Sequence, residues 1–82
     1  MSIPEEDRAR LLRVRRAAFG SRLRQLRAAR RLSQEELAKR AGIDRSNYTE
    51  IELGKTSPRV DSLWDIAAAL GVSVADLFRE PP

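Results

Sequence analysis

The chain has 82 residues, enough for one compact domain with a single core. It contains neither His nor Cys, which argues against metal centres, disulfide frameworks and His-based catalysis. The net charge of +4 is unevenly distributed, because residues 1–32 carry ten Arg against three acids (+7) while residues 33–82 sum to −3. This pattern favours a polyanionic partner. The alternative is a solvated, arginine-rich helix face.

The first element is expected to be a helix that begins near residue 5. Pro4 suits a first helical turn, and the acids at 5–7 oppose the positive end of the helix dipole. An apolar stripe follows at helical spacing through Leu12, Phe19, Leu23 and Leu26. Gly20 predicts a break or kink, since glycine costs about 1 kcal/mol relative to alanine inside a helix. Residues 1–18 are therefore interpreted as an arginine-rich helical extension, as a separate helix or an arm.

Two short helices with a tight turn between them are predicted next. Ser33 and Glu36 have the spacing of a capping box, so a helix should begin at Ser33 and end at Gly42. Asp44 is a good cap for a second helix that stops at Gly54. The inward side chains are expected to be Leu37, Ala38, Ala41, Tyr48 and Ile51.

The rest of the chain predicts two further helices and a tail. A polar turn at 55–58 precedes an apolar helix that ends at Gly71. Ser73 and Asp76 are spaced to cap a short fifth helix. Residues 19–78 are thus interpreted as one all-α domain of five helices, and residues 79–82 as a C-terminal tail that is frayed at Glu80, Pro81 and Pro82.

The segment 33–54 has the properties of a helix-turn-helix unit. Ala38 leaves room for the second helix, Gly42 allows the turn, and Ile43, Tyr48 and Ile51 fasten the second helix to the core. The sequence here resembles the Cro/C1-type, or XRE-type, helix-turn-helix transcription regulators. The resemblance covers about residues 19–78 and is carried by Gln34-Glu35-Glu36-Leu37-Ala38, Ala41-Gly42-Ile43, Ile51-Glu52, Gly54-Lys55, Pro58 and residues 66–72.

This resemblance implies a five-helix, lambda-repressor-like fold and double-stranded DNA as partner. No cofactor is expected, and no metal is expected because the chain lacks Cys and His. Tyr48 departs from the family, which usually has an aliphatic residue there, and we expect a core residue whose hydroxyl reaches the rim. An enzyme is not expected, because the acids lie on helix caps and outer faces. With no long apolar stretch for a signal peptide or membrane span, we expect a cytoplasmic bacterial or phage protein, associated with the nucleoid through DNA.

The outer face of the second helix of the motif is expected to read bases. Helical periodicity turns Ser46, Thr49, Glu50 and Leu53 away from the core, with Arg45 at the exposed start. Arg45 suits guanine, Glu50 suits a cytosine amino group, and Ser46 and Thr49 suit either a base or a thymine methyl. The resemblance also places the main reading positions at Arg45, Ser46 and Glu50. For Glu50 the alternative is a solvated acid or an ion-pair partner of Arg45.

Phosphate contacts are expected on both sides of this reading face. Ser33 and Gln34 stand at a helix start that favours anions, and Lys55, Thr56 and Arg59 follow the reading helix; an ordinary polar loop is the alternative. The resemblance further implies a bridge between Arg27 and Glu52 that orients Arg27 toward DNA, with a purely structural bridge as the alternative.

A homodimer that reads a palindromic site is the expected assembly, since one such domain spans few base pairs. Its interface is expected at Val74, Leu77, Phe78 and Trp64, unless these residues merely close the core. Residues before Phe19 are left open between the partner subunit and DNA phosphates. The architecture resembles restriction-modification controller proteins and small phage repressors, and contact with RNA polymerase is conceivable for such regulators. The alternatives are an antitoxin that chiefly binds a protein and an RNA-binding or coactivator domain of the same fold.

Overall fold

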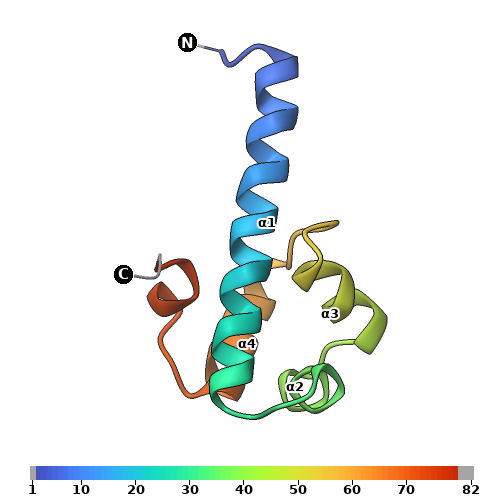
Figure 1. Cartoon of the computed structure of the whole chain (residues 1–82), viewed down its shortest axis with the longest axis vertical. Coiled ribbons are helices and arrows are strands. Elements are labelled where there is room, and N and C mark those ends of the chain that lie inside the picture. The colour runs from blue at the N-terminus through green and yellow to red at the C-terminus, as the bar shows by residue number, and fades with distance from the viewer. Residues whose placement is uncertain (1, 80–82) are drawn as a thin grey trace.

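The computed structural model describes residues 2–79 and contains no strand in that range. It has four α-helices, α1 (Glu5–Ala29), α2 (Gln34–Ala41), α3 (Arg45–Glu52) and α4 (Val60–Leu70), followed by a 3-10 helix, η1 (Ala75–Phe78) (Figure 1). The all-α prediction is confirmed. The five-helix count is wrong, because the fifth element is one 3-10 turn and not an α-helix. The tail predicted at Glu80, Pro81 and Pro82 lies outside the described residues.

Helix α1 is a single uninterrupted helix of 25 residues, so the break predicted at Gly20 is wrong. At 1.5 Å per residue it is roughly 37 Å long, comparable with the 40 Å longest extent of the molecule. Gly20 is buried where α1 crosses the end of α3, and a Cβ built there would lie 2.2 Å from the carbonyl oxygen of Glu52. The glycine permits close helix contact, which offsets its low helix propensity.

The predicted caps of the central helices are present. The Ser33 hydroxyl accepts from the Glu36 amide at 3.0 Å, and the Glu36 carboxylate accepts from the Ser33 amide at 3.0 Å. Asp44 accepts from two amides at the start of α3. Gly42 has φ +67°, in the left-handed region that a helix end of this kind requires. Three residues, 42–44, therefore join α2 to α3.

The core lies where α2, α3 and α4 meet the C-terminal half of α1. Its completely buried side chains are Leu23, Leu37, Tyr48, Ile51, Ile66 and Leu77. The N-terminal half of α1 projects beyond the other helices (Figure 1). Within residues 2–79, no helix combines the length and the apolar character needed to span a membrane.

The end of the domain folds around a second capping box. The amide of Asp76 donates to the Ser73 hydroxyl at 3.2 Å, and the Ser73 amide donates to the Asp76 carboxylate at 3.1 Å. The predicted capping pair is therefore formed, but it begins a single 3-10 turn. Leu77 from this turn fills the core beside α1, and η1 contacts α1 directly.

Candidate nucleic-acid interface

The outer face of α3 is open to solvent. Arg45, Ser46 and Glu50 are exposed, Thr49 is half-buried, and Leu53 just past the helix is 55% exposed. Four of the five residues predicted on this face are thus uncovered by the described chain. Arg45 lies 3.7 Å from the carboxylate of Glu35 on α2, so its acidic neighbour is Glu35 and not Glu50 as the alternative held. Both side chains are largely exposed, and such a pair adds little stability.

The inner face of α3 is fastened to α1 by Glu52, which is only 2% exposed. Arg27 of α1 donates to both carboxylate oxygens, from Nε at 2.7 Å to Oε2 and from Nη2 at 3.1 Å to Oε1. The structure therefore contains the Arg27–Glu52 pair that the family resemblance implied. Arg27 Nη1 also donates to the carbonyl of Leu32 at 2.9 Å. Its guanidinium thus serves the α1–α3 contact and the turn after α1.

Tyr48 completes the environment of Glu52 from one helical turn earlier. Its hydroxyl donates to Glu52 Oε2, and the whole side chain is buried. The prediction that this hydroxyl reaches the rim is wrong. The carboxylate four residues later supplies a buried acceptor, so the phenol is satisfied inside the protein.

Hydrogen bonds within this cluster stabilise the charged forms of Glu52 and Arg27. Burial would raise the pKa of Glu52, but hydrogen bonds from Arg27, Tyr48 and Gln34 hold it below its usual value. The hydrogen bond to Glu52 raises the pKa of Arg27 further, against the effect of burial. Burial and the bond to Glu52 raise the pKa of Tyr48 far above that of a free phenol. Arg27 and Glu52 therefore form an ion pair at neutral pH, with Tyr48 as a neutral donor.

Gln34 connects this buried cluster to the outer face. Its Nε2 donates to Glu52 Oε1 at 3.1 Å, and its Oε1 accepts from the Thr49 hydroxyl at 3.1 Å. One predicted phosphate contact and one predicted base contact are thus hydrogen-bonded to each other. Sequence reasoning missed this link and the role of Tyr48. The spacing of Tyr48 and Glu52, four residues apart on one helix, was the available signal.

The other predicted phosphate residues lie around α3. Ser33 is exposed at the start of α2, Lys55 and Arg59 are exposed after α3, and Thr56 is half-buried. The loop after α3 rests on α1, where Arg16 Nε donates to the Ser57 hydroxyl at 3.1 Å. This contact was also missed. It joins the loop to a helix turn that the sequence assigned to a separate extension.

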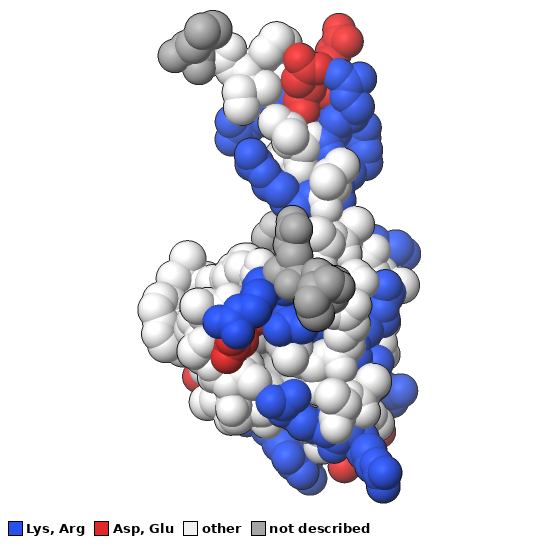
Figure 2. Space-filling view, turned by 60° about the vertical axis from the view of Figure 1, so that its left-hand side comes forward, with Lys and Arg blue, Asp and Glu red and all other residues white. Residues whose placement is uncertain are grey.

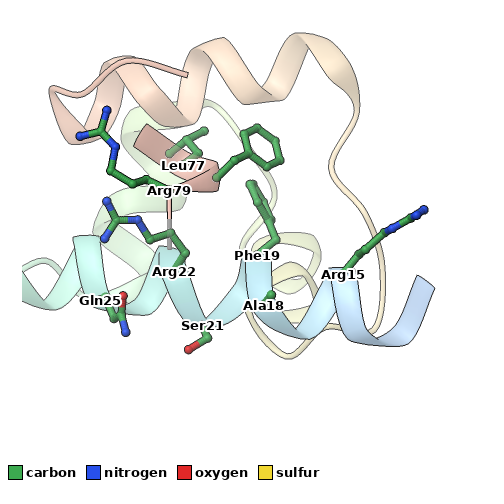
Figure 3. A pocket seen from close by; sticks show the side chains of 9 residues that line it. Arg15, Ala18, Phe19, Ser21, Arg22, Gln25, Leu77 and Arg79 are labelled. Atoms are coloured by element: carbon green, nitrogen blue, oxygen red, sulfur yellow. The ribbon is translucent and has the colours of Figure 1, made fainter. Parts of the chain in front are cut away.

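The residues predicted for a dimer interface do not share one environment. Leu77 is fully buried within the protomer and so follows the core alternative, whereas Val74 is half-buried. Trp64 and Phe78 are 59% and 58% exposed. Figure 3 shows Phe19 of α1 directed toward the η1 segment, and its ring centroid lies 5.1 Å from that of Phe78.

A groove of about 630 Å³ runs between α1 and η1 at this aromatic pair. Arg22 and Arg79 lie together at one end of it, and Arg15 points away at the other (Figure 3). The groove therefore combines an exposed aromatic ring with basic side chains.

Comparison with known proteins agrees with this architecture. A family model described as helix-turn-helix matches residues 23–77. The chain is 37% identical over 62 residues to the cryptic phage CTXphi transcriptional repressor RstR of Vibrio cholerae, covering 76% of this chain and 56% of that protein. It is 38% identical over 63 residues to the control protein C.MunI of a Mycoplasma species, covering 76% and 85%.

The fold is also similar to a solved structure. The crystal structure of the restriction-modification controller protein C.AhdI from Aeromonas hydrophila superposes with a TM-score of 0.75 at 40% identity. The match covers 77% of this chain and 96% of that one. The chain thus spans little more than half of the phage repressor but most of each controller protein.

Proposed function

The chain belongs to the Cro/C1-type family of helix-turn-helix transcription regulators, and we propose that it binds duplex DNA sequence-specifically as a homodimer. The observation that carries this proposal is the two-sided character of α3. Its inner side is fixed to α1 through Glu52, and its outer side exposes Arg45, Ser46 and Glu50. A short helix held in this way is suited to enter the major groove, where base edges are distinguishable.

The outer residues are proposed to act on DNA in two groups. Arg45 donates to guanine, Glu50 accepts from a cytosine amino group, and Ser46 and Thr49 contact bases or thymine methyls. Phosphates are held by Ser33, Gln34, Lys55, Thr56 and Arg59, which flank α3 on both sides. Because Arg27 is bound to Glu52, we assign it mainly to positioning α3. Its side chain is 18% exposed, and we propose only a minor contact with phosphate for it.

The dimer is proposed to form through the exposed aromatic residues Phe78 and Trp64, with Val74 at the edge. A symmetric dimer would read two half-sites about one turn of DNA apart. Replacing Phe78 by Ala should raise the dissociation constant of the dimer in sedimentation equilibrium. An unchanged constant for both Phe78→Ala and Trp64→Ala would place the interface elsewhere.

The biological role is proposed to be that of a controller or phage-type repressor. The support is similarity over most of the length of C.MunI and C.AhdI, which are named as control or controller proteins, and to the repressor RstR. A binding site for this protein upstream of its own gene is expected. Footprinting on that region tests the role, and protection absent there but present at unrelated promoters would contradict it.

The proposed readout is tested with an operator selected from a random duplex pool. Arg45→Ala should lose about 1 to 3 kcal/mol on the selected operator and relax its specificity. Lys55→Ala should weaken all duplexes similarly and reduce the salt dependence of binding. If both variants bind every duplex as the parent does, the assignment of this face is wrong.

A further inference from the structure

The projecting half of α1 is strongly basic and largely exposed. Residues 8–16 contain five Arg and no acid. Seven of the nine side chains of this segment are exposed, and Leu12 and Arg16 are half-buried. Figure 2 shows basic groups over its sides with acidic groups near its tip. Like charges so close together repel each other, and an anionic surface placed against them would relieve that repulsion.

The C-terminal end of this basic segment contacts the loop that follows α3. Arg16 Nε donates to Ser57, and a Cβ built on Gly54 would lie 3.1 Å from the Cα of Ala17. The loop carrying Lys55 is therefore packed directly on α1. Arg13 lies three residues before Arg16 and so shares its side of the helix. Arg16 thus lies beside the loop that carries Lys55, and Arg13 and Arg16 form a basic edge of α1 that leads away from α3.

We propose that this edge of α1, defined by Arg13 and Arg16, binds phosphates of the same duplex beyond those held by the loop. The inference rests on the function proposed above, because it needs α3 in the groove. From Arg16 to Arg13 the helix rises roughly 4.5 Å, and phosphates of one strand recur about every 3.4 Å along the duplex axis. One or two additional phosphates are therefore within the span of the two guanidinium groups.

Duplex DNA is favoured over an anionic membrane by the position of the edge. Exposed Leu11 and Val14 on another side of α1 give the segment an amphipathic character that a lipid surface could also accept. The basic edge, however, is tied by the Arg16–Ser57 contact to a loop beside α3. Vesicle binding is thus the competing outcome to be tested.

The test compares Arg13→Gln with Arg8→Gln on the selected operator. Both residues are exposed arginines of α1, separated by about 140° around the helix at 100° per residue. Arg13→Gln should reduce the slope of log K against log salt by about 0.9, the value expected for one lost phosphate contact. At 0.1 M salt this is about eightfold weaker binding. Arg8→Gln should leave the slope near that of the parent.

A second variant and a second duplex strengthen the result. Arg13→Gln/Arg16→Gln should reduce the slope by about 1.8, and Arg13→Gln alone keeps the Arg16–Ser57 contact intact. On a duplex trimmed to the bases read by α3, the parent and Arg13→Gln should bind alike. Equal slopes for Arg13→Gln and Arg8→Gln on the long duplex would overturn the inference.

The failure of this inference can be separated from failure of the proposed function. If the parent does not distinguish the selected operator from a scrambled duplex, the proposed function itself fails. If the parent discriminates and the α1 variants bind the long duplex unchanged, only the inference fails. The inference would also be overturned if vesicles containing anionic lipid bound the parent but not Arg13→Gln, while the salt dependence of DNA binding was the same for both proteins.

Discussion

Replacing Gly20 by Ala should change the stability of the protein through two opposing effects, a gain in helix propensity and a loss in packing. Alanine favours a helix interior over glycine by about 1 kcal/mol, so α1 in isolation would gain stability. In the folded protein the added Cβ would lie 2.2 Å from the carbonyl oxygen of Glu52 and 2.8 Å from that of Ile51. Both neighbours are backbone atoms of α3, so no side-chain rotation removes the overlap. Helix α3 must move away from α1, and we expect packing to decide the sign.

The expected net effect is a destabilisation of about 2 kcal/mol. Overpacking of a filled interior costs about 1–3 kcal/mol, and the short approach to Glu52 places this site near the upper end. The helix-propensity gain of about 1 kcal/mol offsets part of that cost. For a domain of this size, 1 kcal/mol corresponds to about 4–8 °C in melting temperature, so a loss of about 8–16 °C is expected.

Reversible thermal and urea unfolding, followed by circular dichroism at one protein concentration, measures this change. Ala18→Gly is the matched control, because Ala18 is exposed in the same helix two residues away. It should cost about 1 kcal/mol from propensity alone. A Gly20→Ala protein that melts at or above the parent temperature would refute the close contact between α1 and α3.

Three other outcomes follow from the Glu52 cluster. Glu52→Gln should cost about 3–5 kcal/mol in unfolding experiments, because it leaves the Arg27 charge without its partner; a loss below 1 kcal/mol would contradict the pairing. The folded-state pKa of Glu52 lies below the unfolded value of about 4.3, so its stabilisation is complete above that value and lost as the pH falls through the folded pKa; the acid-induced drop in melting temperature should be smaller in Glu52→Gln. Tyr48 is the single tyrosine of the chain, so its ultraviolet titration should show ionisation only with alkaline unfolding, and an ordinary phenol titration near pH 10 in folded protein would disprove its burial.

The helix boundaries could be predicted where local chemistry determines them. Ser33 with Glu36, Asp44 and Gly42 each act through backbone groups within four residues, so their spacing in the sequence is sufficient evidence. The exposed positions on α3 followed from the helical period in the same way. Such features need no knowledge of distant parts of the chain.

Two of the wrong predictions depend on how elements far apart in the sequence pack together. From the sequence alone Gly20 is expected to break the helix, whereas in the structure it allows the carbonyl of Glu52 to pack closely against α1. The rim position predicted for Tyr48 was wrong because the complete burial of its side chain depends on how α3 packs on the rest of the fold, although its acceptor Glu52 lies only four residues later. The prediction of a fifth α-helix was wrong for a different reason. The capping pair at Ser73 and Asp76 was predicted correctly, but a capping pair does not determine how many helical turns follow it.

The hydrogen bond between Gln34 and Thr49 has a consequence for the speed and cost of recognition. Both side chains are already hydrogen-bonded in the free protein, with Glu52 as the anchor behind them. The conformational entropy of these rotamers is therefore lost during folding and not on contact with an operator. Association can then proceed as docking of a preformed surface, with little rearrangement of the proposed contact residues on α2 and α3.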